Sequence, residues 1–137
     1  MREFGKCEEI TTSPRIVLEE ERSKMVFLNE SRQHVRRIRI DGCVLTEGVR
    51  CDYLIIPENG KEHFIELKGN NVAHAARQLE ESIRQISESP QHSVKYGFII
   101  STRCPLLSSE IQALKLKFKK RYNSLLIIKN IQYQHSI

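Results

Sequence analysis

The sequence contains no tryptophan, few prolines and glycines, and no apolar run longer than a few residues. A helix that crosses a bilayer needs about 20 consecutive apolar residues, so no membrane-spanning helix is expected. Residues 1–6 also do not begin a secretory signal peptide. We therefore expect an intracellular, cytoplasmic protein that does not act in a membrane.

Cysteine is scarce and scattered. The four cysteines are Cys7, Cys43, Cys51 and Cys104. They lack the short paired spacing of zinc sites, and the five histidines form no ligand motif. A chain of this length can bury enough apolar surface to fold without disulfides. We therefore expect reduced, mostly buried thiols and no transition-metal site.

The composition is that of an ordinary globular domain. Hydrophobic residues make up 39% of the 137 residues and charged residues 28%, without repeats or linkers, so one domain spanning residues 1–137 is expected. Lys and Arg number 22 against 17 Asp and Glu, which gives a net charge of +5. This excess is compatible with a polyanionic partner but does not require one.

The N-terminal part of the chain is expected to contain one helix. Residues 1–12 have few periodic apolar residues and should be irregular or form an edge strand. Ser13 and Pro14 resemble a helix start, and the acidic residues that follow would complement the helix dipole. This helix would run to Met25 or as far as Arg32, although its last apolar residues fit a strand equally well.

The remaining elements follow from alternating and helical apolar spacing. Asn71 is the expected N-cap of one helix, and Ser108 or Ser109 of another. The elements are a three-stranded meander over residues 34–45, 51–56 and 63–68, a helix over 71–86, a strand over 94–100, a helix over 108–122, a strand over 125–129 and a polar tail. We thus expect an α/β domain with the order α-β-β-β-α-β-α-β.

The runs 51–56 and 63–68 are separated by a turn sequence with Pro and Gly, which predicts a β-hairpin. Because strand side chains alternate between faces, Glu66 and Lys68 should share one face. The turn should bring Asp52 beside them. Two carboxylates and one ammonium would then converge in a small volume.

Such a cluster is costly unless the repulsion between the carboxylates is resolved, and a hard divalent cation is the usual resolution. Mg²⁺ held by Asp52 and Glu66 would activate water and polarise a phosphodiester. The carbonyl of Leu67 is a candidate further ligand. Lys68 would orient or help deprotonate the attacking water, and Gly69 would let substrate and backbone approach closely.

An Asp on one strand and Glu-x-Lys on the next, followed by a helix, resembles the PD-(D/E)XK nuclease superfamily. The similarity in element order spans roughly residues 13–130, and its specific motifs lie within residues 41–79. The resemblance implies a restriction-endonuclease-like mixed β-sheet flanked by helices. It also implies a Mg²⁺-dependent endonuclease that cuts DNA, with Mn²⁺ as a substitute ion, and a homodimer is compatible with one centre cutting one strand.

By matching positions, the resemblance assigns Asp52 and Glu66 to the metal and Lys68 to catalysis. Gln78 resembles the Gln or Lys that members of the superfamily frequently place near the scissile phosphate, and it is a candidate substrate contact. Cys51 stands where the family name has Pro, a position that varies among members.

Another acidic residue, which many members carry on a first helix, is not assigned. The candidates are Glu19, Glu20, Glu21 and Glu30. Asp41 could also reach the site, although an Asp before Gly more commonly forms a turn. The number of metal ions therefore stays open.

Each feature also has an ordinary interpretation. Asp, Glu and Lys near strand ends are most often surface residues or salt bridges, and Gln78 on a helix needs no role beyond solvation. The basic residues could contact phosphates or simply form solvated faces. They are Lys115, Lys117, Lys119, Lys120 and Arg121 in one group and Arg36, Arg37 and Arg39 in another. Neither group has the interleaved aromatic residues of single-strand binders.

Two other functions stay open. The first is a non-catalytic nuclease-fold module that binds DNA or a protein. The second is an interaction or immunity-type protein that binds a protein partner through an apolar or charged patch. Salt dependence would distinguish DNA binding from an apolar interface.

Overall fold

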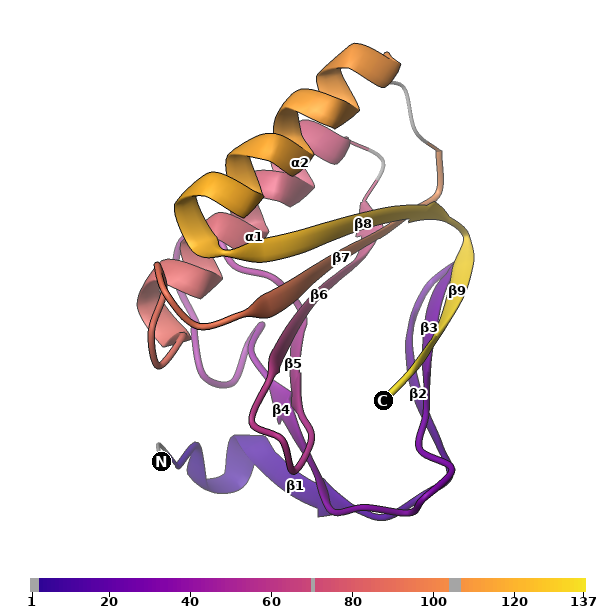
Figure 1. Ribbon diagram of the computed structural model, residues 1–137. Helices are drawn as coiled ribbons and strands as arrows, with labels where there is room; N and C mark the ends of the chain where they lie inside the picture. The colour runs from indigo at the N-terminus through magenta and orange to yellow at the C-terminus, as the bar shows by residue number, and fades with distance from the viewer. Residues whose placement is uncertain (1–2, 70, 104–106) are drawn as a thin grey trace.

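The computed structural model describes residues 3–69, 71–103 and 107–137, without the side chains of Lys68 and Gly69. A six-stranded sheet carries two helices on one face and a three-stranded sheet on the other (Figure 1). The order of the larger sheet is β1 (Glu8–Thr11), β4 (Val35–Arg39), β5 (Tyr53–Ile56), β6 (Glu62–Gly69), β7 (Lys95–Ser101) and β8 (Ser124–Asn130). In this sheet β1, β4, β5 and β6 pair antiparallel with their neighbours, whereas β6, β7 and β8 pair parallel. The mixed α/β class is therefore confirmed.

Helices α1 (Val72–Ile86) and α2 (Ser108–Tyr122) form the layer on one face. Asn71 caps α1 as predicted, because its side-chain oxygen accepts a hydrogen bond from the amide of His74. The apolar stripe of α1 is buried against the strands and comprises Val72, Ala75, Ala76, Leu79, Ile83 and Ile86. No helix within the described residues is both long and apolar enough to cross a membrane.

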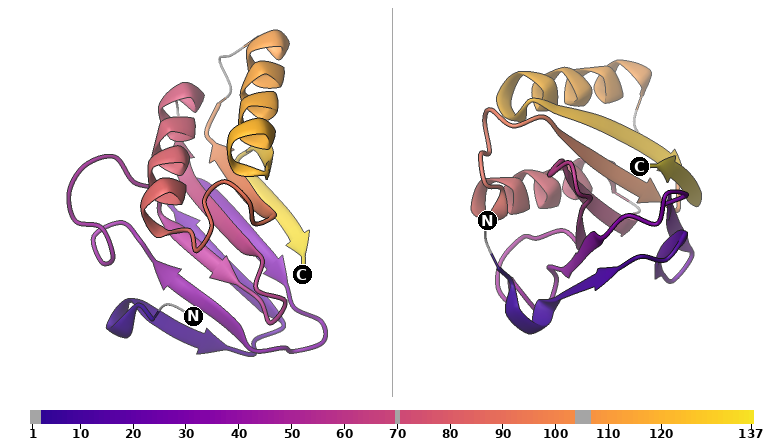
Figure 2. Two further views of the ribbon diagram at one scale, coloured as in Figure 1. Left: turned by 60° about the vertical axis from the view of Figure 1, so that its left-hand side comes forward. Right: turned by 60° about the horizontal axis from the view of Figure 1, so that its bottom comes forward.

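The smaller sheet is formed by β2 (Arg15–Glu20), β3 (Ser23–Leu28) and β9 (Gln132–Ser136), as Figure 2 shows from two further directions. β3 lies in the middle, antiparallel to β2 and parallel to β9. Leu18 and Phe27 of this sheet pack into one core cluster with Ile65 and Leu67 of β6. The central strand β6 is thus buried on both faces.

The helix predicted after Ser13 is wrong, because that segment forms the β2–β3 hairpin. Ile16 and Leu18 are buried while Val17 between them is half-buried, which is the alternation of a strand. The acidic residues lie at the end of β2 and in the turn, where Glu21 adopts a left-handed backbone conformation with φ of 49°. The local sequence of this segment fits a helix and a strand about equally well. Burial of its apolar residues against β6 and β7 favours the strand.

Other differences are smaller. The meander of β4, β5 and β6 is present, but residues 43–45 form a loop with one isolated bridge between Asp41 and Leu45. The polar tail forms β9, because its backbone completes the sheet beside β3. The lead-in contains an edge strand, β1, as one of the two alternatives predicted.

The prediction that the cysteines are reduced is wrong for two of them, because Cys7 and Cys43 form a disulfide. They are 36 residues apart in sequence, so spacing gives no signal of the pairing. The antiparallel register of β1 and β4, in which Glu8 faces Ile38, brings the two segments together. Cys51 is a buried free thiol as predicted, and Cys104 lies outside the described residues.

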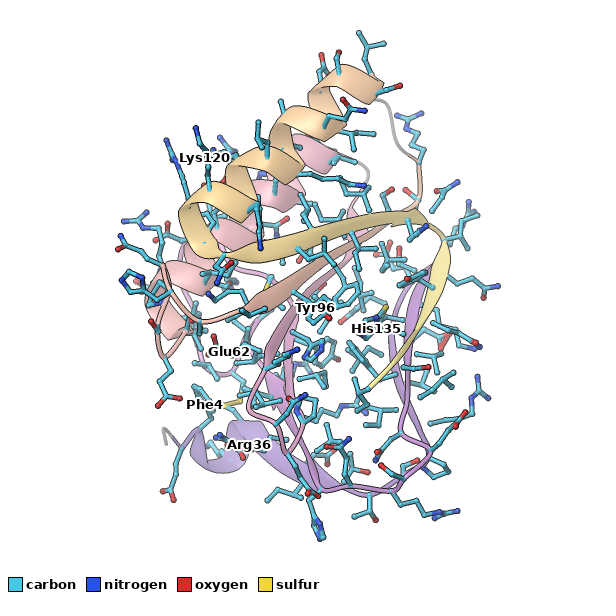
Figure 3. The ribbon with its side chains drawn as sticks, in the orientation of Figure 1. Phe4, Arg36, Glu62, Tyr96, Lys120 and His135 are labelled. Atoms are coloured by element: carbon cyan, nitrogen blue, oxygen red, sulfur yellow. A yellow bond between two sulfur atoms is a disulfide. The ribbon has the colours of Figure 1, made fainter. Side chains whose placement is uncertain are left out.

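A cluster of rings fills the space between the two sheets, where Tyr96 and His135 lie close together (Figure 3). His63 is 2% exposed, and its ring stacks on that of Tyr96 with centroids 4.8 Å apart. Its Nδ1 lies 3.1 Å from the carbonyl of Ile55 and 3.0 Å from that of Lys61, which suits a neutral ring protonated at Nδ1. Burial, and after it the charge of His135, lower the pKa of His63 to about 4.

Reduction of the disulfide should destabilise the protein. A bridge that closes a loop of this length stabilises by about 4 kcal/mol, mainly by restricting the unfolded chain. The free energy of unfolding, measured by urea titration with and without a thiol reductant, should fall by that order. The variant in which both Cys7 and Cys43 are Ser is the control and should not respond to the reductant. Equal stability of the oxidised and reduced wild type would contradict the bridge.

Acid should destabilise the protein through His63. Its pKa of about 4 in the folded state lies below the ordinary 6.5, so its contribution is complete above about pH 6.5 and is lost as pH falls toward 4. The lost stability is about 3 kcal/mol over that interval. The free energy of unfolding, measured by urea titration, should depend less on pH for His63→Phe than for the wild type. The exposed His92→Gln is the control and should follow the wild type. Parallel profiles for His63→Phe and the wild type would exclude this role.

Candidate active site

Asp52 and Glu66 are brought together by the pairing of β5 with β6. In this antiparallel register Tyr53 faces Ile65, so Asp52, directly before β5, lies beside the Ile65–Glu66 segment of β6. The amide of Asp52 donates to the carbonyl of Ile65 at 3.0 Å, and the amide of Leu67 donates to Oδ2 of Asp52 at 2.8 Å. The backbone therefore fixes both the strand position and the carboxylate of Asp52.

Glu66 points to the face of the sheet that carries the helices. Phe64, two residues earlier in β6, packs in the core beneath α1 and α2, whereas Ile65 and Leu67 pack toward the smaller sheet. Because side chains alternate along a strand, Glu66 lies on the side of Phe64. Cys51 and Leu54, which flank Asp52 and Tyr53, both pack on the helix side, so regular alternation is interrupted at Asp52.

Both carboxyl groups are almost removed from solvent. Asp52 is 5% exposed and Glu66 is 4% exposed. Burial is the main cause of a raised pKa for Asp52, and the hydrogen bond from the amide of Leu67 opposes it. Glu66 also acts on the Asp52 carboxyl and lowers the pKa of Asp52, so the two side chains lie close together.

Two further acidic residues act on this pair. The negative charges of Glu20 and Asp41 each raise the pKa of Asp52. Glu20 is the last residue of β2 and is half-buried on the side that faces the larger sheet, with Leu18 and Ile16. Among the four acidic residues considered for the first helix, Glu20 is thus near enough to act on Asp52, although it lies on a strand.

Asp41 is held by Arg50, whose Nε lies 2.7 Å from Oδ1 of Asp41. Gln78 of α1 donates from Nε2 to the carbonyl of Arg50 at 3.0 Å. Gln78 therefore connects the helix to the segment that leads into Asp52. Arg50 and Gln78 line a hollow of about 220 Å³ together with Asp41, Gly48, Val49 and His74. The two carboxylates themselves do not line it.

The donor set of Asp52 and Glu66 suits a hard cation such as Mg²⁺, which is commonly held by one or two carboxylates and keeps several waters. The two carboxyl groups lie close together, and burial and the neighbouring acids raise the pKa of Asp52. A bound cation would neutralise the negative charge of the pair. Among the described residues, no group of three or more His, Cys, Asp or Glu is arranged to hold a metal.

Lys68 lies at an irregularity of β6. Leu67 pairs with Ile100 and Gly69 with Ser101, so Lys68 is an extra residue in the pairing with β7. Such a bulge changes the direction of the strand and is frequent beside active sites. The side chains of Lys68 and Gly69 lie outside the described residues, and the roles predicted for them stay predictions. The same holds for the carbonyl of Leu67 as a metal ligand.

Sequence reasoning named Asp52, Glu66 and Gln78, but it did not single out Arg50 or choose Glu20. Arg50 lies two residues before Asp52, and this closeness in sequence is the feature that could have indicated it. Glu20 ends a run whose apolar residues alternate, so reading that run as a strand would have placed Glu20 on its buried side.

Comparison of the chain with protein-family models, with curated proteins and with solved structures gave no match. Inference about function therefore starts from the site itself.

Loss of one carboxylate should abolish stabilisation by Mg²⁺. In wild type, millimolar MgCl₂ should raise the melting temperature by several degrees, because the ion binds the folded state only. Asp52→Asn should not respond to MgCl₂, yet in metal-free buffer it should be at least as stable, because one of two buried negative charges is removed. Circular dichroism melts measure both, with exposed Glu88→Gln as the control. A wild-type melting temperature that does not change on addition of MgCl₂ would contradict the cation site.

Proposed function

We propose that the protein is a Mg²⁺-dependent nuclease of the PD-(D/E)XK type that hydrolyses phosphodiester bonds in DNA. The observation that carries the proposal is the proximity of the buried carboxyl groups of Asp52 and Glu66 where β5 pairs with β6. Burial of two adjacent acids costs stability, and such a cost is typical of a functional site.

The arrangement of elements supports a restriction-endonuclease-like fold. From β4 to β8 the chain runs strand, strand, strand, helix, strand, helix, strand, with β5 and β6 in the middle of the sheet, and β9 follows in the smaller sheet. This is the order that the resemblance implies after its first helix. The β2–β3 hairpin occupies the place of that helix in the chain and supplies Glu20.

Asp52 and Glu66 would hold the ion, with the carbonyl of Leu67 as a candidate third ligand and Mn²⁺ as an alternative to Mg²⁺. The ion, when bound, would polarise the scissile phosphate and activate water. The amide of Leu67 keeps the Asp52 carboxylate oriented. Lys68 would orient the attacking water and add positive charge where the phosphate gains negative charge.

DNA is the substrate class that we propose, since the net charge is +5 and the groove residues near the site include Arg50 and Gln78. A homodimer would place one centre on each strand of a duplex.

The near-complete burial of the two carboxylates favours one alternative, a non-catalytic DNA-binding module that keeps these residues. Calorimetric titration with Mg²⁺ and a plasmid-nicking assay separate the two. A binding module should neither bind the ion tightly nor cut.

Lys68→Ala and Glu66→Gln should each reduce plasmid nicking by about a hundredfold or more, because each removes a group that acts on the reacting phosphate. Affinity for DNA and the melting temperature should stay near wild type for Lys68→Ala. Lys61→Ala, an exposed lysine shortly before β6, is the matched control and should cut normally. Nicking that survives Lys68→Ala would remove Lys68 from the mechanism, and nicking in the presence of a chelator would remove the metal.

A further inference from the structure

A basic hollow lies where the C-terminal ends of both helices meet. It has a volume of about 880 Å³ and is lined by Arg84, Ser89, Pro90, Gln91, His92, Lys120, Arg121 and Tyr122. Arg84, Lys120 and Arg121 are exposed, and Lys120 projects from the outer side of α2 in Figure 3. Three cationic side chains that border one hollow favour an anionic ligand.

A buried ammonium lies beneath this hollow. Lys95 is 0% exposed, and its Nζ donates to the carbonyls of Ser89 and Pro90 at 3.2 Å each and to that of Tyr122 at 2.7 Å, as well as to that of Ser93. The carbonyl oxygens of three lining residues are therefore turned inward. Burial lowers the pKa of Lys95, while the charge of Glu62 and the carbonyl acceptors favour its charged form.

The same lysine offsets the negative end of α2. The last carbonyls of a helix carry partial negative charge, which would repel an anion. Lys95 binds the carbonyl of Tyr122, the last residue of α2, and Lys119, Lys120 and Arg121 stand in the last turn. The hollow is thus electropositive although it adjoins helix C-termini.

Two further hollows continue this one along α1. A hollow of about 660 Å³ shares Arg84, Arg121 and Tyr122 with the basic hollow. It shares Gly48 and Val49 with the small hollow beside the candidate site, which Arg50 and Gln78 line. We call these three hollows the α1 track.

The acidic residues of the α1 track are engaged by neighbours. Glu81 pairs with Arg84 at 2.9 Å, and Glu80 pairs with Lys117 at 2.9 Å and accepts from the hydroxyl of Tyr122. Asp41 is held by Arg50. Arg77, Lys120 and Arg121 add positive charge along the track. Among the described residues that line it, the one Phe, Tyr or Trp is Tyr122, which is 6% exposed, so the lining offers no aromatic ring of this kind for stacking bases.

We infer that the α1 track binds the sugar-phosphate backbone of duplex DNA without regard to sequence, from the basic hollow to the small hollow that Arg50 and Gln78 line beside the candidate site. The location of the reacting phosphate rests on the proposed function, whereas the backbone contacts do not. α1 has 15 residues and is about 22 Å long, which corresponds to roughly six phosphates of one strand. Phosphate contacts position DNA but carry no sequence information.

The test measures binding rather than cleavage. Fluorescence anisotropy with a labelled mixed-sequence duplex, in a chelating buffer, gives affinity as a function of salt. The double variant Lys120→Ala/Arg121→Ala should bind at least tenfold more weakly, and the slope of log affinity against log salt should fall by about 2. A second duplex of unrelated sequence should bind the wild type within about twofold.

The matched control is Lys24→Ala/Lys61→Ala, which removes the same charge from residues that line none of the three hollows. It should retain nearly wild-type affinity and slope. Equal losses in both double variants, an unchanged slope in the track variant, or no binding by wild type would overturn the inference. Circular dichroism melts verify that both variants fold.

The outcomes also separate this inference from the proposed function. A protein that binds through the α1 track but never nicks DNA would refute the nuclease alone. A protein that nicks DNA while the track variant binds as tightly as wild type would refute the track alone.

Discussion

The register of β5 against β6 is the constraint on which the candidate site depends. Because Tyr53 faces Ile65, Asp52 and Glu66 lie close together, and the amide of Leu67 is left to bind the Asp52 carboxylate. A shift of one residue would turn each side chain of the shifted strand to the opposite face and separate the two acids. The apolar residues that fix the register of the hairpin therefore also fix the positions of the two acids.

That arrangement is supported from both sides of the sheet. α1 follows β6 closely and covers the helix-side face, where Gln78 holds the carbonyl of Arg50. The smaller sheet covers the other face and brings Glu20 toward Asp52. Two layers thus enclose two acidic groups in a water-poor place, where a cation would bind strongly because screening is weak. The apolar packing around the two acids offsets the free-energy cost of burying them.

Local sequence signals predicted the hairpin, the cap at Asn71 and α1, because each depends on residues that are close in the chain. The proximity of Asp52 and Glu66 was predicted for the same reason, since one turn joins the two segments that carry them. The β2–β3 hairpin, β9 and the bridge between Cys7 and Cys43 depend on partners remote in sequence, and local patterns there fitted helix, tail and free thiols. Glu20 was not singled out because its role follows from how one sheet packs on the other.

The pairing of β9 with β3 has a consequence for how the chain matures. Lys24 pairs with Gln132 and Leu28 with Ser136, so β3 is synthesised well before β9, the strand that completes its sheet. Until then one edge of β3 stays open, and an open strand edge is a template for pairing with other chains. During translation the β2–β3 hairpin is thus open to pairing with other chains, and completion of the small sheet by β9 closes that edge.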